Sequence, residues 1–232
     1  MLVWDLPEPA GRGPALNRER IVRAALAIAD EQGPGSITMR RLAADVGSST
    51  PMSLYRYVGS KHGIEDLLLD AVFGEIGLPD GHSGHWRDDL RTLAHESRRV
   101  LRRHPWFAEL SHHRPLFGPN ALRHNEWALR AVDGHGLRPA AMMSVVSMVF
   151  GYAVSYAHSE AEETRMRQRI GVRDDAELAE TVRSYVDRIV ADPRYPMVGR
   201  WITDGGEVDP DEQFELGLEC LLDGIAARVI TG

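Results

Sequence analysis

Residues 36–61 read SITMRRLAADVGSSTPMSLYRYVGSK, and the local chemistry of this stretch decides the fold. Thr38 is a good N-cap because its hydroxyl can accept a hydrogen bond from an otherwise unpaired N–H of a first helix. Leu42 and Val46 then follow at helical spacing and predict an apolar face. Gly47 stands where this helix must end, since glycine leaves the right-handed region without a steric penalty. The stretch therefore predicts a short helix that ends in a tight turn.

A second helix is expected directly after the turn. Thr50 can cap it, and Pro51 suits its first position because the missing N–H would have no partner there. Leu54 and Val58 lie four residues apart and predict its inner face. The side chains left largely outside are Met52, Ser53, Tyr55, Arg56 and Tyr57. An outer face with two tyrosines and an arginine suits contacts to phosphates and base edges.

The motifs TMRRLAADVG, PMSLYRYV and SK, with RIVRAALAIADEQG upstream, resemble the helix-turn-helix of the tetracycline-repressor (TetR) family. The resemblance covers residues 17–71 densely. It implies that the second helix of the motif faces DNA, together with the lysine that opens the next helix. The resemblance and the outward face together give the expected DNA-binding residues, which are Thr38, Arg40, Thr50, Pro51, Met52, Ser53, Tyr55, Arg56, Tyr57 and Lys61.

The residue types within this set predict two roles. Backbone contacts are expected mainly from hydroxyl-bearing and cationic side chains, namely Arg40, Thr50, Tyr55, Tyr57 and Lys61. Base-edge contacts are expected from Met52, Ser53 and Arg56. The guanidinium of Arg56 can bind a guanine in a bidentate manner.

Two alternatives compete with DNA binding. The first is a purely structural helical hairpin. The second is a helical small-molecule-binding protein with a degenerate helix-turn-helix that does not read DNA. Two departures from the TetR pattern support this second alternative. The segment from Gly47 to Tyr55 is one residue longer than the common TetR spacing, and His62 and Gly63 follow Lys61 where an acidic residue is usual. The combination of caps, glycine turn and Leu-Tyr pair favours DNA binding.

The charge distribution supports a nucleic-acid partner despite a net charge of −7 over 232 residues. Residues 1–62 contain eight Arg or Lys and six Asp or Glu, a net charge of +2. The remaining residues contain 19 and 28, a net charge of −9. The basic residues therefore concentrate in the part expected to contact phosphates. The single cysteine, Cys220, excludes an intrachain disulfide and agrees with a reducing cytoplasm.

The sequence predicts an all-α chain in four parts. Residues 1–16 lack the pattern of a signal peptide and are expected to form a disordered arm, in which Arg12 could touch DNA. Residues 17–76 hold the three-helix DNA-binding domain and its connecting helix. Residues 77–85, GLPDGHSGH, read as a linker. Residues 86–232 are expected to form a helical effector-binding and dimerisation domain.

Periodicity places the individual helices. The expected helices outside the motif cover residues 17–32, 61–76, 86–103, 106–110, 119–133, 139–159, 176–190 and 211–230. The intervening residues 160–175 read as a charged, mobile connection, and residues 193–209 read as irregular.

The segment PAAMMSVVSMVFGYAVSYAHS at residues 139–159 carries no charge. Its length is close to that of a membrane span. The segment contains four serines, two tyrosines and a histidine, and no second apolar segment of the chain supports a membrane span. These features favour a buried core helix instead. Such a helix is expected to be covered by its own chain on one side and by a second subunit on the other. The terminal FELGLECLLDGI resembles the last helix of TetR-type C-terminal domains, which implies a four-helix dimer core.

An apolar effector cavity is expected between helices 86–103, 119–133 and 139–159, with plain core packing as the alternative. Its expected lining is His95, Trp127, Met148 and Phe150. The pairs His82 and His85, and His112 and His113, read as solvated histidines and not as metal ligands.

The sequence shows no nucleophile motif, phosphate loop or metal-ligand spacing, so no enzymatic activity, cofactor or metal is expected. The prediction is a cytoplasmic, homodimeric, ligand-responsive repressor. Its expected partners are a palindromic double-stranded DNA operator and a small-molecule effector, with no membrane.

Overall fold

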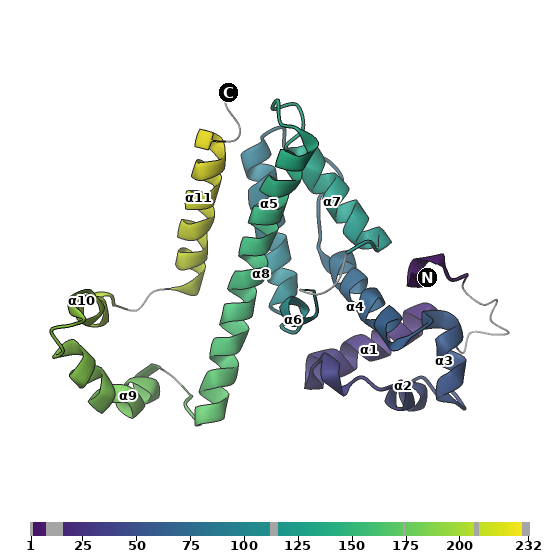
Figure 1. Ribbon diagram of the computed structural model, residues 1–232, viewed down its shortest axis with the longest axis horizontal. Helices are drawn as coiled ribbons and strands as arrows, with labels where there is room; N and C mark the ends of the chain where they lie inside the picture. Colours follow the sequence, from purple (N-terminus) through teal and green to yellow (C-terminus); the bar gives the residue numbers. More distant parts are fainter. Residues whose placement is uncertain (1, 8–15, 112–115, 174, 207–208, 229–232) are drawn as a thin grey trace.

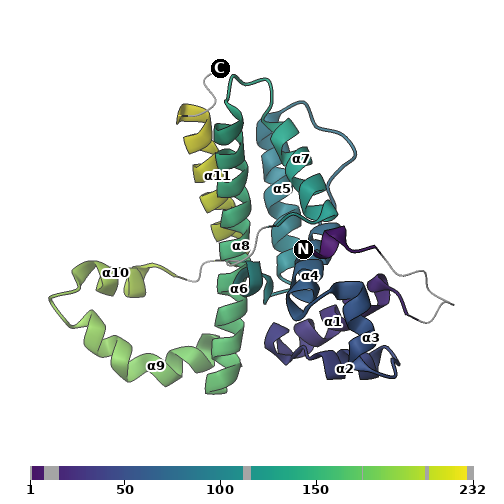
Figure 2. The ribbon, with the colours of Figure 1, turned by 45° about the vertical axis from the view of Figure 1, so that its right-hand side comes forward.

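The computed structural model describes residues 2–7, 16–111, 116–173, 175–206 and 209–228. These residues form eleven α-helices and two short 3-10 helices, and no strand occurs among them. Helices α1 to α4 gather at one end of the molecule, and the longer helices of the body stand beside them (Figure 1). Helices α9 and α10 project from the body as an arm in both views (Figures 1 and 2). The predicted all-α fold is confirmed.

The N-terminal helices are α1 (Arg18–Gln32), α2 (Met39–Asp45), α3 (Pro51–Val58) and α4 (Lys61–Glu75). Three side-chain N-caps are present. The Asn17, Thr38 and Ser60 side chains accept hydrogen bonds from the backbone N–H groups of Arg20, Arg41 and Gly63, at 2.8, 3.2 and 3.0 Å. Each bond satisfies an otherwise unpaired N–H, so short sequence signals fix where these helices begin.

The body contains α5 (Trp86–Leu101), α6 (Phe107–Ser111), α7 (Pro119–Ala131), α8 (Pro139–Ile170) and α11 (Pro210–Arg228). Helix α5 packs closely against α8, and α7 and α11 contact both of them. The arm consists of α9 (Asp175–Val190) and α10 (Pro196–Asp204).

Two segments are more regular than the sequence suggested. Helix α8 continues through residues 160–170, which were expected to form a mobile connection. The pair Arg167 Nη2 and Glu163 Oε1, one turn apart, lies at 2.7 Å and supports the helix, as charges four residues apart do. Residues 196–204 form α10 within the segment expected to be irregular.

The burial of α8 in the single subunit is one-sided, and the expected cover by a second subunit stays a prediction. Its inner face is buried by its own chain at Val145, Val146 and Val149. The most apolar window of α8 is long enough for a membrane span, yet only 28% of it is buried in the single subunit. The apolar residues are therefore divided between a packed inner face and an exposed outer face.

The hydrophobic interior forms two clusters. One lies around α1 to α4 and includes Phe107 of α6 and Ala121 of α7. The other joins α5, α7, α8 and α11 around Leu93, Val149 and Phe214. Because the first cluster extends from α4 into the body, movement of α4 is mechanically tied to the body helices.

The N-terminal residues depart from the expected disordered arm at one place. Val3–Asp5 form a 3-10 helix, and Val3 is buried in the same cluster as the residues of α4. Arg18 Nη2 donates to the backbone oxygen of Leu6 at 3.0 Å, which ties this segment to α1. Arg12, His112 and His113 lie outside the described residues.

Candidate DNA-binding surface and effector site

A network of hydroxyl groups around the Thr50 carbonyl oxygen builds the turn between α2 and α3. Gly47 has a φ of 67°, as its place at the end of α2 requires. Ser53 Oγ donates to the Thr50 oxygen at 2.6 Å, and the single proton of Ser48 Oγ can go either to Ser53 Oγ or to the Thr50 oxygen, 3.2 Å away. The Thr50 side chain makes no capping bond, which corrects the expected role of that hydroxyl. The longer turn is thus an ordered structure held by Ser48 and Ser53.

Helix α3 presents the predicted outer face only in part. Leu54 and Val58 are completely buried, as the spacing predicts, and Pro51, Met52, Tyr55 and Arg56 are exposed. Tyr57 is half-buried because its ring packs against the N-terminal cluster. The expectation that Tyr57 points largely outward is therefore wrong. Ser53 is half-buried as well, and its hydroxyl is used in the turn.

Three cations near α3 have no partner within the described part of the chain. Arg40, Arg56 and Lys61 are exposed and make no hydrogen bond or ion pair there. Arg41, by contrast, bonds to Gln32 Oε1 at 2.6 Å.

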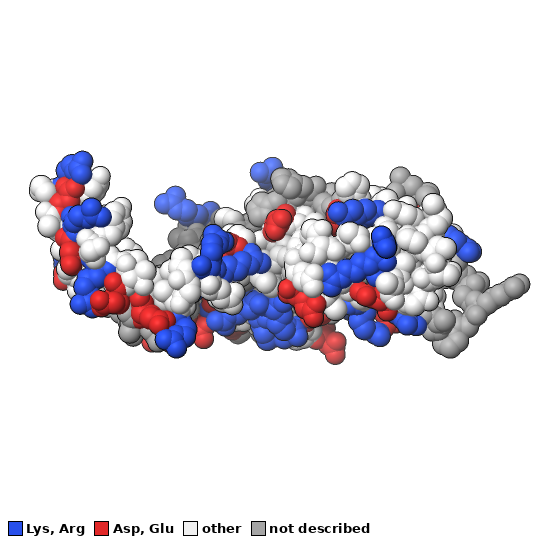
Figure 3. All heavy atoms as spheres, turned by 90° about the horizontal axis from the view of Figure 1, so that it is seen from below, with Lys and Arg blue, Asp and Glu red and all other residues white. Residues whose placement is uncertain are grey.

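Neighbouring cations are likewise occupied, Arg23 by Glu19 at 2.5 Å and Arg18 by the Tyr57 carbonyl oxygen at 3.1 Å. The three cations predicted to contact DNA are therefore left free to bind a phosphate or a base edge. Figure 3 shows the face of the molecule on which α1 to α3 lie, where basic side chains alternate with neutral ones and a few acidic ones.

A close approach of α3 and α4 explains the unusual Gly63. A Cβ atom on Gly63 would lie 1.9 Å from the backbone oxygen of Val58, so a larger residue would force the two helices apart. Ser60 caps α4 through the N–H of Gly63 at 3.0 Å. Helix α4 therefore starts firmly at Lys61.

The four residues predicted to line the effector cavity are not brought together. His95 Nε2 pairs with Glu215 at 3.0 Å at the partly exposed contact of α5 with α11. Met148 is 42% exposed, whereas Phe150 faces the interior. Met148 and Phe150 lie two positions apart on α8, and side chains two positions apart on a helix point about 200° away from each other.

Trp127 belongs to a different cavity. Its Nε1 donates to the Pro79 oxygen at 2.9 Å, and its ring lines a cavity of about 400 Å³. Gly74 of α4 and Arg123 of α7 line the same cavity. This cavity lies between α4, α7 and the connection that follows α4.

An aromatic cluster around His124 lies in the interior between four helices. The ring centre of His124 is 5.0 Å from that of Phe73 on α4 and 5.0 Å from that of Phe150 on α8. Phe107 of α6 completes the cluster, at 5.6 Å from Phe73. Sequence reasoning missed His124, although its spacing from Ala121 and Ala128 places it on the apolar face of α7.

His124 is 2% exposed, and neither of its ring nitrogens has a hydrogen-bond partner. Burial lowers the pKa of His124 to about 4, and the nearby Asn125 side chain, which does not reach hydrogen-bond geometry with either nitrogen, offsets this only in part. The ring is therefore neutral at pH 7. A buried, unpaired polar group costs about 1–3 kcal/mol, so its presence calls for an explanation.

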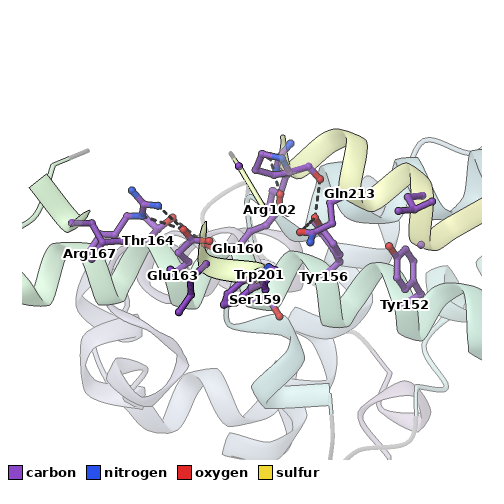
Figure 4. Close-up of a pocket in the computed structure, with 16 residues that line it drawn as sticks. Arg102, Tyr152, Tyr156, Ser159, Glu160, Glu163, Thr164, Arg167, Trp201 and Gln213 are labelled. Carbon is purple, nitrogen blue, oxygen red and sulfur yellow. Dashed lines mark hydrogen bonds and ion pairs between the residues drawn. The ribbon is translucent and has the colours of Figure 1, made fainter. Parts of the chain in front are cut away.

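An open groove of about 1220 Å³ lies between α8, α10 and α11. Figure 4 shows Tyr152, Tyr156, Glu160 and Trp201 along it. Tyr156 Oη donates to the Pro210 oxygen at 2.8 Å, and burial raises the pKa of the Tyr156 hydroxyl. Charged side chains among its apolar walls and an open side make this groove unlike a closed apolar cavity for a small ligand.

The described residues contain no group of three or more His, Cys, Asp or Glu side chains placed to hold a metal ion. His82 and His85 are exposed, as expected, and His82 also contacts two side chains of the body. Its Nδ1 lies 3.2 Å from Asp89 Oδ2, and its ring lies against Trp127.

Comparisons with known proteins agree with the fold and with the helix-turn-helix. The family described as "Tetracyclin repressor-like, C-terminal domain" matches residues 78–229. The "HTH-type transcriptional repressor DrrR1" of Streptomyces coeruleorubidus is 36% identical over 231 residues, covering 98% of this chain and 84% of the relative. An "HTH-type transcriptional regulator" of Saccharopolyspora erythraea is 37% identical over 227 residues, covering 97% and 91%.

A similar solved structure is that of the TetR family protein ActR of Streptomyces coelicolor in complex with (S)-DNPA. It has a TM-score of 0.73 and 25% identity, covering 91% of this chain and 98% of the other. The chain belongs to the TetR family of helix-turn-helix transcriptional regulators, and the predicted family is confirmed.

Proposed function

We propose that the chain is a homodimeric repressor that binds a palindromic operator and is released from it by a small-molecule effector. The observation that carries this proposal is the set of unpaired cations Arg40, Arg56 and Lys61 beside the exposed face of α3. Each can bind a phosphate or a base edge without first breaking an internal ion pair. We further propose that the protein has no catalytic activity, that it needs no cofactor and that it is cytoplasmic.

The outer faces of α8 and α11 support a dimer. Ser147 and Met148 of α8, and Leu216 and Cys220 of α11, are exposed in the single subunit. Small and apolar side chains on two adjacent helices permit close packing against a second copy. The arm adds further exposed apolar surface, since Trp201 is 71% exposed.

The division of labour on DNA follows from the position of each side chain. Arg56 and Met52 on α3 face outward and are assigned to base edges, with Ser53 beside them. Tyr55, Lys61 and Arg40 are assigned to the backbone, with Thr38, Thr50 and Pro51 at the helix starts beside them. Two copies related by a two-fold axis would read half-sites about 34–36 Å apart or a multiple of that spacing. Residues 77–85 would divide the DNA-binding part from the body.

A small-molecule effector is supported by the similarity to ActR, whose structure contains (S)-DNPA. To convert almost fully bound operator into almost fully free operator, the effector must bind the DNA-incompetent state about 10⁴-fold more tightly. The alternative function is a small-molecule-binding protein whose helix-turn-helix does not read DNA. The ordered turn around Thr50 and the free cations favour the regulator.

The test is a gel-shift titration with the DNA upstream of the chain's own coding region, at several salt concentrations. The wild type is expected to bind that DNA more tightly than a scrambled sequence, with an affinity that falls steeply as salt rises. The triple variant R40A/R56A/K61A should lose this binding. The variant is expected to fold, because the three side chains are exposed. Circular dichroism checks this expectation. Equal binding of the specific and scrambled DNA would favour the alternative.

A further inference from the structure

The N-terminal residues 2–7, which we name the N-terminal strap, dock on the helices of the DNA-binding part. Val3 is 3% exposed, and the 3-10 helix Val3–Asp5 contacts α4 (Figure 2). The N–H groups of Asp5 and Leu6 donate to the backbone oxygens of Leu2 and Val3 at 3.1 and 3.3 Å. The strap is therefore an ordered structure with a buried anchor.

The strap covers the junction between α3 and α4, where two glycines make room for it. A Cβ atom on Gly59, at the end of α3, would lie 2.8 Å from Leu6 Cδ1. A Cβ atom on Gly63, in the first turn of α4, would lie 3.4 Å from Val3 Cβ. Strap side chains thus fill the space that side chains at the junction would otherwise occupy, and they pack directly on its backbone.

Arg18 of α1 joins the strap to the end of α3. Its Nη2 donates to the Leu6 oxygen at 3.0 Å, and its Nε donates to the Tyr57 oxygen at 3.1 Å. One guanidinium therefore holds both carbonyl groups, and its planar fork fixes their relative positions. Because Tyr57 is the last but one residue of α3, this contact helps to fix the direction in which α3 points.

Trp4 places the same strap against the joint between α4 and the body. Its half-buried ring packs on the N-terminal cluster, and it lines a small cavity together with Asp70 of α4 and Phe117 before α7. Asp70 accepts hydrogen bonds from the Ala121 N–H at 2.9 Å and from Asn120 Nδ2 at 3.0 Å, at the start of α7. The strap thus touches both the end of α3 and the place where α4 is held to the body.

We propose that the N-terminal strap is a positioning element for operator recognition, whose docked state holds α3 at the angle that base contacts need. This proposal rests on the proposed function. Hydrogen bonds to base edges weaken steeply when their geometry is lost, whereas non-specific binding to phosphates tolerates many orientations. Release of the strap should therefore remove sequence preference and leave the phosphate contacts. If the docked fraction falls to about one tenth, the Kd for the operator rises about tenfold.

The test compares Val3→Asp with Leu2→Asp in gel shifts at several salt concentrations. Both variants add one negative charge to the strap, but Val3 is buried and Leu2 is 47% exposed. The probes are the DNA upstream of the chain's own coding region and a scrambled sequence. In Val3→Asp the preference for the upstream DNA should fall at least about tenfold, while binding to scrambled DNA changes by less than about twofold. Leu2→Asp should keep the preference.

Two further results of this comparison decide between positioning and other roles. A merely structural role would reduce the folded fraction and weaken the binding of both DNAs alike. Direct contact of the strap with phosphates would give the two variants different slopes of log affinity against log salt. Either result, or an equal preference in the two variants, would overturn the proposal.

Hydrogen exchange of the wild type, followed by mass spectrometry, is a second readout that needs no variant. The amides of Asp5 and Leu6 are bonded within the docked strap and exchange when it opens. Saturating upstream DNA should slow their exchange more than saturating scrambled DNA, because docking and specific binding favour each other reciprocally. Equal exchange would refute the strap's role alone. A wild type that binds both DNAs equally would refute the regulator and the strap's role together.

Discussion

His104 Nδ1 lies 2.7 Å from Asp30 Oδ1, and this contact joins the connection between α5 and α6 to the end of α1. The other ring nitrogen lies 3.1 Å from Glu75 Oε2 at the end of α4. Trp106 Nε1 donates to the same oxygen of Asp30 at 2.7 Å, and Arg103 pairs with Glu75 at 2.8 Å. Each ring nitrogen of His104 therefore faces a carboxylate, one on α1 and one on α4. One buried side chain thus fastens α1 and α4 to the body.

Replacement of His104 should weaken the whole fold. His104→Ala leaves Asp30 and Glu75 without their shared partner, and we expect the free energy of unfolding to fall by about 2–4 kcal/mol. Urea denaturation followed by circular dichroism measures this loss. His135→Ala, in an exposed loop, is the matched control and should change the value by less than about 0.5 kcal/mol. A loss in His104→Ala as small as that of the control would mean that the contact does not stabilise the fold.

His124 should make the stability depend on pH. Its pKa of about 4 in the folded chain lies below the ordinary value of 6.5, so the unfolded chain binds more protons between these values. The stabilisation is therefore complete above about pH 6.5 and is lost as the pH falls towards 4. For this group alone we expect a loss of about 2 kcal/mol between pH 7 and pH 5.

Urea titrations of the wild type and His124→Phe at both pH values isolate this contribution. The variant should lose less stability on acidification by about that amount, and it should be no less stable at pH 7, because an apolar ring removes an unpaired polar group. If the two proteins respond equally to pH, the buried ring is not the group that titrates.

Arg56→Ala should alter sequence preference. If the guanidinium is bidentate to a guanine, we expect a loss of about 1–3 kcal/mol in operator affinity and relaxed discrimination at one base position. A gel-shift series with single base changes in the operator reports both effects. Arg23→Ala, which removes only an exposed pair with Glu19, serves as control. A uniform loss on every DNA sequence would show that Arg56 binds phosphate alone.

Lys61→Ala should act on all DNA alike. The side chain is exposed at the start of α4, and removal of one phosphate contact should lower the slope of log affinity against log salt by about one unit. Measurement at four or more salt concentrations gives this slope. An unchanged slope would remove Lys61 from the backbone contacts.

Two substitutions distinguish a residue that is needed for folding from a residue that is expected at the subunit contact. Val146 is 2% exposed inside its own subunit, so Val146→Asp should unfold the chain, with a loss above about 3 kcal/mol. Leu216 is 67% exposed on α11, so Leu216→Asp should leave a folded monomer. Sedimentation velocity with circular dichroism distinguishes these outcomes. A dimer of unchanged stability in Leu216→Asp would place the subunit contact elsewhere.

The sequence predicted best what depends on neighbours in the chain. Helix starts at Asn17, Thr38 and Ser60 follow from a side chain that reaches an N–H three residues ahead. The half-burial of Tyr57 could not be read in the same way, because it depends on a cluster formed by distant helices. The same holds for His124, whose importance appears only when Phe73, Phe107 and Phe150 are placed around it.

The effector lining was predicted poorly for a related reason. Periodicity showed that residues 139–159 form an apolar helix, but a helix that is apolar all round does not reveal which side faces the interior. Met148 and Phe150 were therefore assigned to one cavity although they point in different directions. The extension of α8 to Ile170 was missed because a charged segment can form a helix through ion pairs such as Arg167 with Glu163.

Because α4 begins at Lys61 beside the DNA-binding surface, a small tilt of this helix produces a large displacement at that end. With 15 residues, α4 separates Lys61 from Glu75 by about 21 Å along its axis, at about 1.5 Å per residue. A tilt of about 5° about the Glu75 end would carry the Lys61 end sideways by about 2 Å. Because Gly63 leaves no gap between α4 and the Val58 carbonyl, α3 must travel with it. In a two-fold pair the two displacements add, to about 4 Å, which exceeds the tolerance of any hydrogen bond to a phosphate.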